Sequence, residues 1–256
     1  MAFHLSLADI PAARKVAERA FQRIEFRLER EKLNVWCALL ALELRFGSEK
    51  SLQETIDRAC NHNNAKQVYL RVCEMLERDA STSASESSVE RLESMFHKMC
   101  RKFKSKKKVW IAHIEYLLKY ARQDDAQQLV RRALQSLPQY KHVETMSKFA
   151  QLLFEHGSPE RARTVFDGIL QKNRNRLDLF FILVDKEVKY GDIETARSLF
   201  ENEVKAGHTK RMKLSDKQVK SLFKKWFAFE QQHGTAESKE NVKNAARDYV
   251  EQSGKS

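Results

Sequence analysis

The sequence predicts an all-α fold: a superhelical array of about seven helix-turn-helix repeats. Two observations predict it. First, 42% of the 256 residues are apolar, whereas only 7 are glycine and 3 are proline, which favours helices over a turn-rich β protein. Second, five segments open on a large apolar residue, a turn position follows eleven residues later, and a second segment's core position falls eleven beyond that. The opening anchors are Trp36, Trp110, Met146, Phe180 and Phe223. A repeat of this length stacks into an array that offers a binding surface.

The first helix of each repeat is expected to begin near its anchor and to end at a glycine or alanine. These turn positions are Gly47, Ala121, Gly157, Gly191 and Gly234. We expect the glycines to adopt the left-handed conformation that ends helices. The residue after each glycine is a good N-cap for the second helix: Ser48, Ser158, Asp192 and Thr235. An acid precedes three of the glycines by four positions: Glu43, Glu187 and Glu230. We interpret these acids as hydrogen-bonding groups within each repeat rather than as catalytic residues.

The second helix carries its apolar residues on one stripe. In the fifth repeat they fall at i, i+3, i+4, i+7 and i+8: Ala162, Val165, Phe166, Ile169 and Leu170. The first repeat departs from the pattern, because residues 13–21 resemble a second helix whose partner would start before the chain begins. Residues 1–30 are therefore expected to form a truncated first repeat, with residues 2–7 as the end of a first helix, in a fragment of a longer protein.

The third repeat has Tyr69 as its anchor, but its second helix comes seven residues late. We expect the excess to form a Ser-rich loop at residues 80–88. With this insertion, residues 1–256 are expected to form one continuous array.

Two sets of residues resemble the half-a-tetratricopeptide (HAT) repeat, a relative of the tetratricopeptide repeat. They are Trp36, Glu43 and Gly47 in a first helix, and Ala13, Arg14, Glu18, Arg19 and Ala20 in a second helix. The resemblance implies a role in RNA processing. A closer resemblance, carried by residues 31–48, 142–170 and 210–234, is to the C-terminal repeat region of a family of ribosomal RNA processing proteins. It implies a nuclear, nucleolar scaffold that binds proteins of the small-subunit processome and supports early pre-rRNA processing.

The formal charge of +12 and a pI near 9.5 favour a polyanionic partner. Residues 98–108 hold seven basic residues and no acid, and residues 205–225 form a second basic stretch. The candidate contacts to RNA or to an acidic partner are Lys98, Arg101, Lys102, Lys104, Lys106, Lys107, Lys108, Lys210, Arg211, Lys213 and Lys217. Both stretches join one repeat to the next, so we expect them along one edge of the array. A nuclear-import signal and a plain solvated surface are the alternatives.

No enzymatic, cofactor or metal chemistry is expected. The four cysteines, Cys37, Cys60, Cys73 and Cys100, show no CxxC spacing, and the eight histidines form no HExxH motif. The anchors Trp36, Tyr69, Trp110, Phe180 and Phe223 are interpreted as packing residues; Trp226 stays open between exposed and packed. No membrane partner is expected. The RNA partner would be pre-rRNA or a small nucleolar RNA (snoRNA). The alternative functions are a stand-alone RNA-binding module and a HAT-mediated homodimer in another RNA-processing complex.

Overall fold

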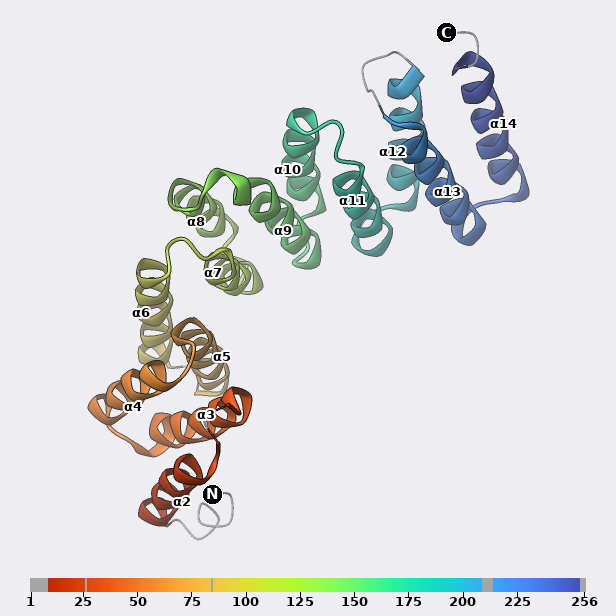
Figure 1. Cartoon of the computed structure of the whole chain (residues 1–256). Coiled ribbons are helices and arrows are strands. Elements are labelled where there is room, and N and C mark those ends of the chain that lie inside the picture. The colour runs from red at the N-terminus through yellow and green to blue at the C-terminus, as the bar shows by residue number, and fades with distance from the viewer. Residues whose placement is uncertain (1–8, 26, 84, 209–213, 254–256) are drawn as a thin grey trace. The chain divides into compact units, whose positions relative to one another are not determined.

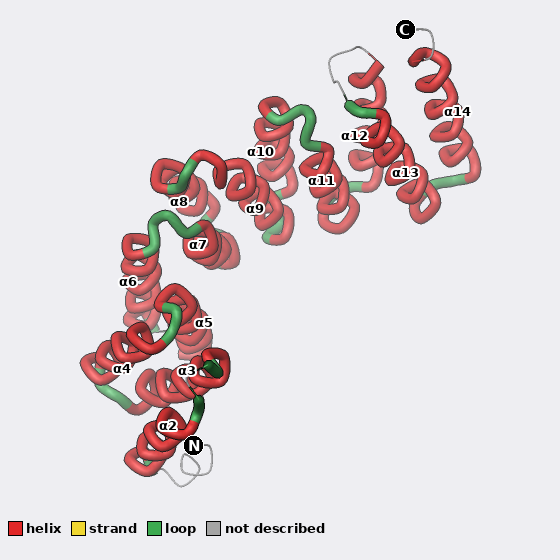
Figure 2. Tube along the Cα trace, viewed as in Figure 1, coloured by secondary structure: helices red, strands yellow, loops and turns green. Residues whose placement is uncertain are grey.

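The computed structural model describes residues 9–25, 27–83, 85–208 and 214–253 (Figure 1). Throughout these residues the chain forms thirteen α-helices and one short 3-10 helix, with no strand (Figure 2). The predicted all-α helical-repeat fold is confirmed. The expected helix at residues 2–7 lies outside the described residues.

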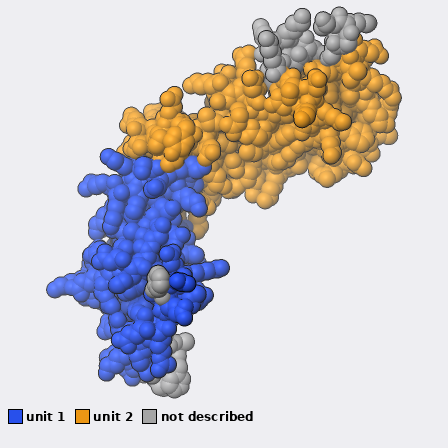
Figure 3. Space-filling model, in the orientation of Figure 1, with its two compact units in different colours: residues 1–113 blue, residues 114–256 orange. Residues whose placement is uncertain are grey.

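The chain divides into two compact units, residues 1–113 and 114–256, with the boundary inside one helix (Figure 3). The single continuous array expected over residues 1–256 therefore stays a prediction.

Unit 1 is built from consecutive antiparallel helices. They are α2 (Ile10–Arg23), α3 (Glu29–Phe46), α4 (Glu49–His62), α5 (Ala65–Ser83), α6 (Glu86–Lys102) and the start of α7 (Lys107–Lys119). Each helix packs on the next along the chain from α2 to α6, and α3 also contacts α5. Contact between every second helix is what stacking of hairpins requires, because the first helix of one repeat then covers that of its neighbour.

Unit 2 continues the same pattern. Its elements are α8 (Gln123–Ser136), the 3-10 helix η1 (Gln139–Lys141), α9 (His142–Glu155), α10 (Pro159–Lys172), α11 (Leu177–Tyr190), α12 (Ile193–His208), α13 (Asp216–His233) and α14 (Ala236–Ser253). α9 contacts α11 directly. A buried aromatic cluster joins α11, α12 and α13 through Phe180, Phe200 and Trp226. In Figure 1 the turns α9–α10, α11–α12 and α13–α14 lie at one edge of this unit, and the connections α8–α9 and α10–α11 lie at the other.

The Ser-rich loop expected at residues 80–88 is wrong. α5 continues to Ser83 and α6 begins at Glu86, so the additional residues lengthen two helices. The hydroxyls of Ser81 and Thr82 each donate to the carbonyl four residues earlier, both at 2.8 Å. A polar run can therefore stay helical, because its side chains are satisfied by the helix itself.

The expectation that the turn glycines adopt the left-handed conformation is correct only at Gly157. Gly157 has φ +80, whereas the glycines that end α3, α11 and α13 have φ of −92, −112 and −108. A side chain at any of these three would instead collide with the carboxylate of the glutamate four residues earlier. The small residue is required there for space and not for backbone conformation.

Those glutamates connect consecutive repeats. Glu43 and Glu230 are almost completely buried, and each accepts two hydrogen bonds from an arginine on the preceding helix. For Glu43 the donor is Arg14 of α2, at 2.7 and 3.0 Å. For Glu230 it is Arg197 of α12, at 2.8 and 3.1 Å. The hydrogen bonds are thus made between repeats as well as within them.

A third copy of this arrangement joins α10 to α11. Arg163 donates to Glu187, which is fully buried, and the backbone amide of Asp192 donates to the same carboxylate at 3.0 Å. In all three copies the arginine directly follows a completely buried alanine: Ala13, Ala162 and Ala196. The recurring Ala-Arg pair is the sequence signal that could have identified this contact.

Candidate functional site

The first basic stretch joins α6 to α7; we call residues 98–108 the basic connection. On α6 the side chains of Phe96, Met99 and Cys100 are buried. Lys98 and Arg101 fall between these positions in the helical period, so both are exposed. Packing of the apolar face of α6 thus places its cations in solvent.

The turn within the basic connection has a fixed backbone. The amides of Phe103 and Lys106 donate to the carbonyls of Met99 and Phe103, at 3.0 and 2.9 Å. The indole Nε1 of buried Trp110 donates to the carbonyl of Lys104 at 2.8 Å. The rings of Phe103 and Tyr69 pack in a T-shaped arrangement, with ring centroids 5.6 Å apart. Two of the predicted anchors, Tyr69 and Trp110, therefore hold this turn in place.

The cations on this turn point into solvent. Lys102, Lys104, Lys106 and Lys108 are exposed, and Lys107 is half-buried. Although Lys102 is exposed, its Nζ also makes a cation–π contact, 5.0 Å from the centroid of the Tyr69 ring.

Few carboxylates neutralise these charges. Within the described parts of the chain, no ion pair with a carboxylate forms at Lys98, Arg101, Lys104, Lys106 or Lys108. The first turn of α7 holds no acid either. Its two lysines therefore add to the positive end of the helix dipole instead of opposing it. An anion at the start of α7 would be attracted both by these two lysines and by the helix dipole.

The second stretch is only partly described. Lys210, Arg211 and Lys213 lie outside the described residues. Lys217 is exposed on the first turn of α13. Lys225, further along α13, forms an ion pair with Asp185 at 2.7 Å and is less available to a partner. Because the two stretches belong to different units, their expected position along one edge stays a prediction.

The anchors lie in the cores of the two units. Trp36, Tyr69, Trp110 and Phe180 are buried, and Phe223 is half-buried. Trp226, three residues later on α13, is buried instead and stacks on Phe200 with ring centroids 6.0 Å apart. Trp226, which the sequence left open, is thus a packed residue.

The described residues hold no group of three or more His, Cys, Asp or Glu side chains that could bind a metal ion. Within the described residues the cysteines form no disulfide, and burial raises the pKa of the Cys73 thiol well above its ordinary value. Among the described residues, no helix is both long enough and apolar enough to span a membrane.

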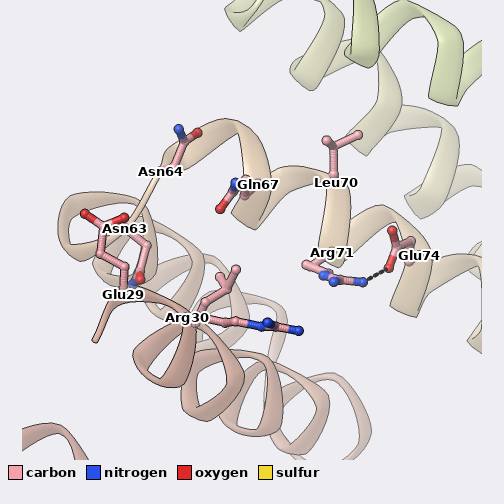
Figure 4. Close-up of a pocket in the computed structure, with 9 residues that line it drawn as sticks. Glu29, Arg30, Asn63, Asn64, Gln67, Leu70, Arg71 and Glu74 are labelled. Carbon is pink, nitrogen blue, oxygen red and sulfur yellow. Dashed lines mark hydrogen bonds and ion pairs between the residues drawn. The ribbon is translucent and has the colours of Figure 1, made fainter. Parts of the chain in front are cut away.

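A polar groove in unit 1 has no counterpart in the sequence analysis. It lies between the start of α3 and the start of α5, with a volume of about 530 Å³ (Figure 4). Its wall includes the amide side chains Asn63, Asn64 and Gln67, the apolar Leu33 and Leu70, and both charge signs: Glu29, Arg30, Arg71 and Glu74. Arg71 pairs with Glu74 at 2.7 Å. Residues from two helices, α3 and α5, and from the turn before α5 meet here, which is why sequence spacing did not reveal the groove.

Comparison with known proteins gives a consistent set of relatives, although no family model matches the chain. The chain is 40% identical over 253 residues to the rRNA biogenesis protein rrp5 of Schizosaccharomyces pombe, a match that covers 99% of this chain and 14% of that protein. It is 36% identical over 251 residues to the protein RRP5 homologs of Mus musculus and Homo sapiens, covering 98% of this chain and 13% of each. The chain thus spans about one seventh of the length of the curated relatives it matches.

Proposed function

Because the chain belongs with the RRP5 proteins, also called programmed cell death protein 11, we propose that it serves rRNA biogenesis as a non-enzymatic helical scaffold. The share of the relatives that it matches is consistent with their C-terminal repeat region. The scaffold acts in the nucleus, within the nucleolus, where it contacts proteins of the small-subunit processome and supports early pre-rRNA processing. The name of the Schizosaccharomyces pombe relative, rRNA biogenesis protein rrp5, supports this assignment.

The RNA contact is assigned to the basic connection. The observation that carries it is the set of exposed cations there, most of which pair with no carboxylate in the described parts of the chain, on a turn held by buried aromatic rings. A preordered cluster of cations binds a phosphate backbone by releasing its condensed counterions. Such a cluster positions an RNA without selecting its sequence. This suits a scaffold whose specificity comes from protein partners.

Protein contact is assigned to the polar groove of unit 1. Its amide side chains can donate to and accept from a peptide backbone, and its two leucines add apolar contact. The groove carries both charge signs, so it favours a polypeptide over a nucleic acid. Together the two sites would let the chain bridge an RNA and a protein.

Charge reversal tests the RNA contact. The variant is Lys104→Glu, Lys106→Glu and Lys108→Glu; the matched control reverses three exposed lysines on separate helices, Lys15, Lys50 and Lys172. The measurement is the dissociation constant for single-stranded RNA across a salt titration. Removal of one lysine–phosphate interaction should reduce the slope of log K against log salt by about 0.7. We expect a reduction of about 2 in the variant and the wild-type slope in the control. Equal slopes in all three proteins would refute the assignment.

A further inference from the structure

Aromatic rings recur at one repeat position that the anchors do not explain. The residue ten positions after the anchor, at the carboxyl end of the first helix, is aromatic or histidine in four repeats of unit 2: Tyr120, His156, Tyr190 and His233. The same position in unit 1 holds Phe46. These residues end, or directly follow, α7, α9, α11, α13 and α3.

Unlike the anchors, most of these rings face solvent. The exposed fractions are 54% for Phe46, 43% for Tyr120 and 37% for Tyr190, and His233 is also exposed. A single exposed ring needs no explanation, because apolar atoms make up much of any protein surface. Exposed rings at the same position of successive repeats form a row, and such rows mark contact sites.

Cations lie beside the two tyrosines of the row. Lys119 Nζ is 5.9 Å from the centroid of the Tyr120 ring. At Tyr190 the corresponding distances are 5.2 Å for Lys186 and 4.8 Å for Lys189. Lys186 also pairs with Glu155, whereas Lys189 is exposed. Each tyrosine therefore combines a ring for stacking with a positive charge.

We propose that single-stranded RNA lies along the turn edge of unit 2, with bases stacked on Tyr120 and Tyr190 and phosphates beside Lys119 and Lys189. Rings interleaved with cations are the pattern that binds single strands, because every base has a face to stack. An acidic peptide would need only the lysines. The proposal deepens the proposed RNA contact and rests on it.

The helical array makes this geometry suitable. The turns α9–α10 and α11–α12, beside which His156 and Tyr190 lie, are at one edge of unit 2 (Figure 1), and α9 contacts α11 directly. Tyr120 holds the same repeat position in the α7–α8 turn. Packed helices are about 8–10 Å apart, so neighbouring turns are separated by roughly one to two nucleotides of extended strand. Some helical-repeat proteins likewise bind one RNA base with each repeat.

The test is anisotropy of a fluorescein-labelled 12-nucleotide single-stranded oligoadenylate bound to the intact chain at several salt concentrations. The variant pairs Tyr120→Leu with Tyr190→Leu, and a second pair replaces both with Phe. The matched control is Tyr140→Leu. Tyr140 is 76% exposed with Lys141 Nζ 5.3 Å from its ring, but it lies on the opposite edge, in the α8–α9 connection.

We expect the leucine pair to bind about 10- to 100-fold more weakly with an unchanged salt slope, because stacking releases no counterions. The phenylalanine pair and Tyr140→Leu should bind like the wild type. An oligomer of the same length without bases should bind the wild type and the leucine pair equally.

Three results would overturn the inference: full affinity in the leucine pair, an equal loss in the phenylalanine pair, or an equal loss in Tyr140→Leu. Thermal unfolding of each variant confirms that it is folded. If the leucine pair keeps full affinity while charge reversal in the basic connection still reduces the slope, only the stacking inference fails. If the wild type binds no RNA even at low salt, the proposed RNA contact fails with it.

Discussion

Arg14 of α2 donates to both carboxylate oxygens of Glu43 on α3, at 2.7 and 3.0 Å, and this carboxylate fills the space that a side chain at Gly47 would need. The hydrogen bonds from Arg14 hold the pKa of Glu43 below its usual value of 4.5. The same relationship joins α10 to α11 and α12 to α13. It sets how consecutive hairpins meet, and so it positions the edges on which the proposed contacts lie.

Breaking one of these pairs should destabilise unit 2. Arg163→Ala leaves the buried Glu187 carboxylate without its guanidinium, at an expected cost of ~2–4 kcal/mol in unfolding free energy. The control Arg161→Ala, two residues earlier, removes an exposed pair with Asp124 and should cost less than about 0.5 kcal/mol. Urea unfolding of both variants is the measurement, and equal costs would show that burial of the pair is unimportant.

Alanine should have opposite effects at two glycines. At Gly191 its Cβ would collide with the Glu187 carboxylate, so Gly191→Ala should destabilise by ~1–3 kcal/mol although φ is negative there. At Gly168, inside α10, a Cβ would meet open space. Gly168→Ala should therefore stabilise by ~0.5–1 kcal/mol through helix propensity. Thermal unfolding of both variants is the measurement. If Gly191→Ala left the stability unchanged, the close approach of the Glu187 carboxylate to residue 191 would be disproved.

Stability should depend on pH through Glu203 on α12. Burial raises the pKa of Glu203 from 4.5 to about 7. The folded state therefore binds more protons than the unfolded state between those values, and stability should fall as pH rises through this window. Glu203→Gln should flatten the pH dependence of stability in this window. Glu201→Gln, which changes a side chain that is 44% exposed, should leave that pH dependence unchanged. Unfolding free energies from pH 4 to 8 test this, and parallel curves for Glu203→Gln and the wild type would contradict it.

The core of α13 should depend on Trp226 more than on Phe223. Trp226 is 6% exposed and stacks on Phe200, whereas Phe223 is half-buried. Trp226→Ala should cost ~3–5 kcal/mol and Phe223→Ala roughly half as much. Chemical unfolding of the two variants measures both costs. A larger loss of unfolding free energy for Phe223→Ala would show that Phe223, the anchor predicted from the sequence, is the more important packing residue.

The sequence predicted what depends on local periodicity. Trp36, Trp110 and Phe180 are buried near the positions that the repeat assigned them, because a helix repeats its inward face every few residues. It did not reveal what depends on contacts between helices. The requirement for Gly47 comes from a carboxylate held by an arginine of another helix, and the polar groove collects residues from α3, α5 and the turn between α4 and α5. Spacing alone cannot show which side chains meet across a packing interface.

The central claim is that this chain contacts RNA through the basic connection while serving rRNA biogenesis. The most direct measurement is RNA–protein crosslinking mapped by mass spectrometry on pre-ribosomal particles that contain the chain. We predict crosslinks between pre-rRNA and peptides that cover residues 98–108. Absence of the chain from these particles, or crosslinks confined to helices far from the basic connection, would contradict the claim.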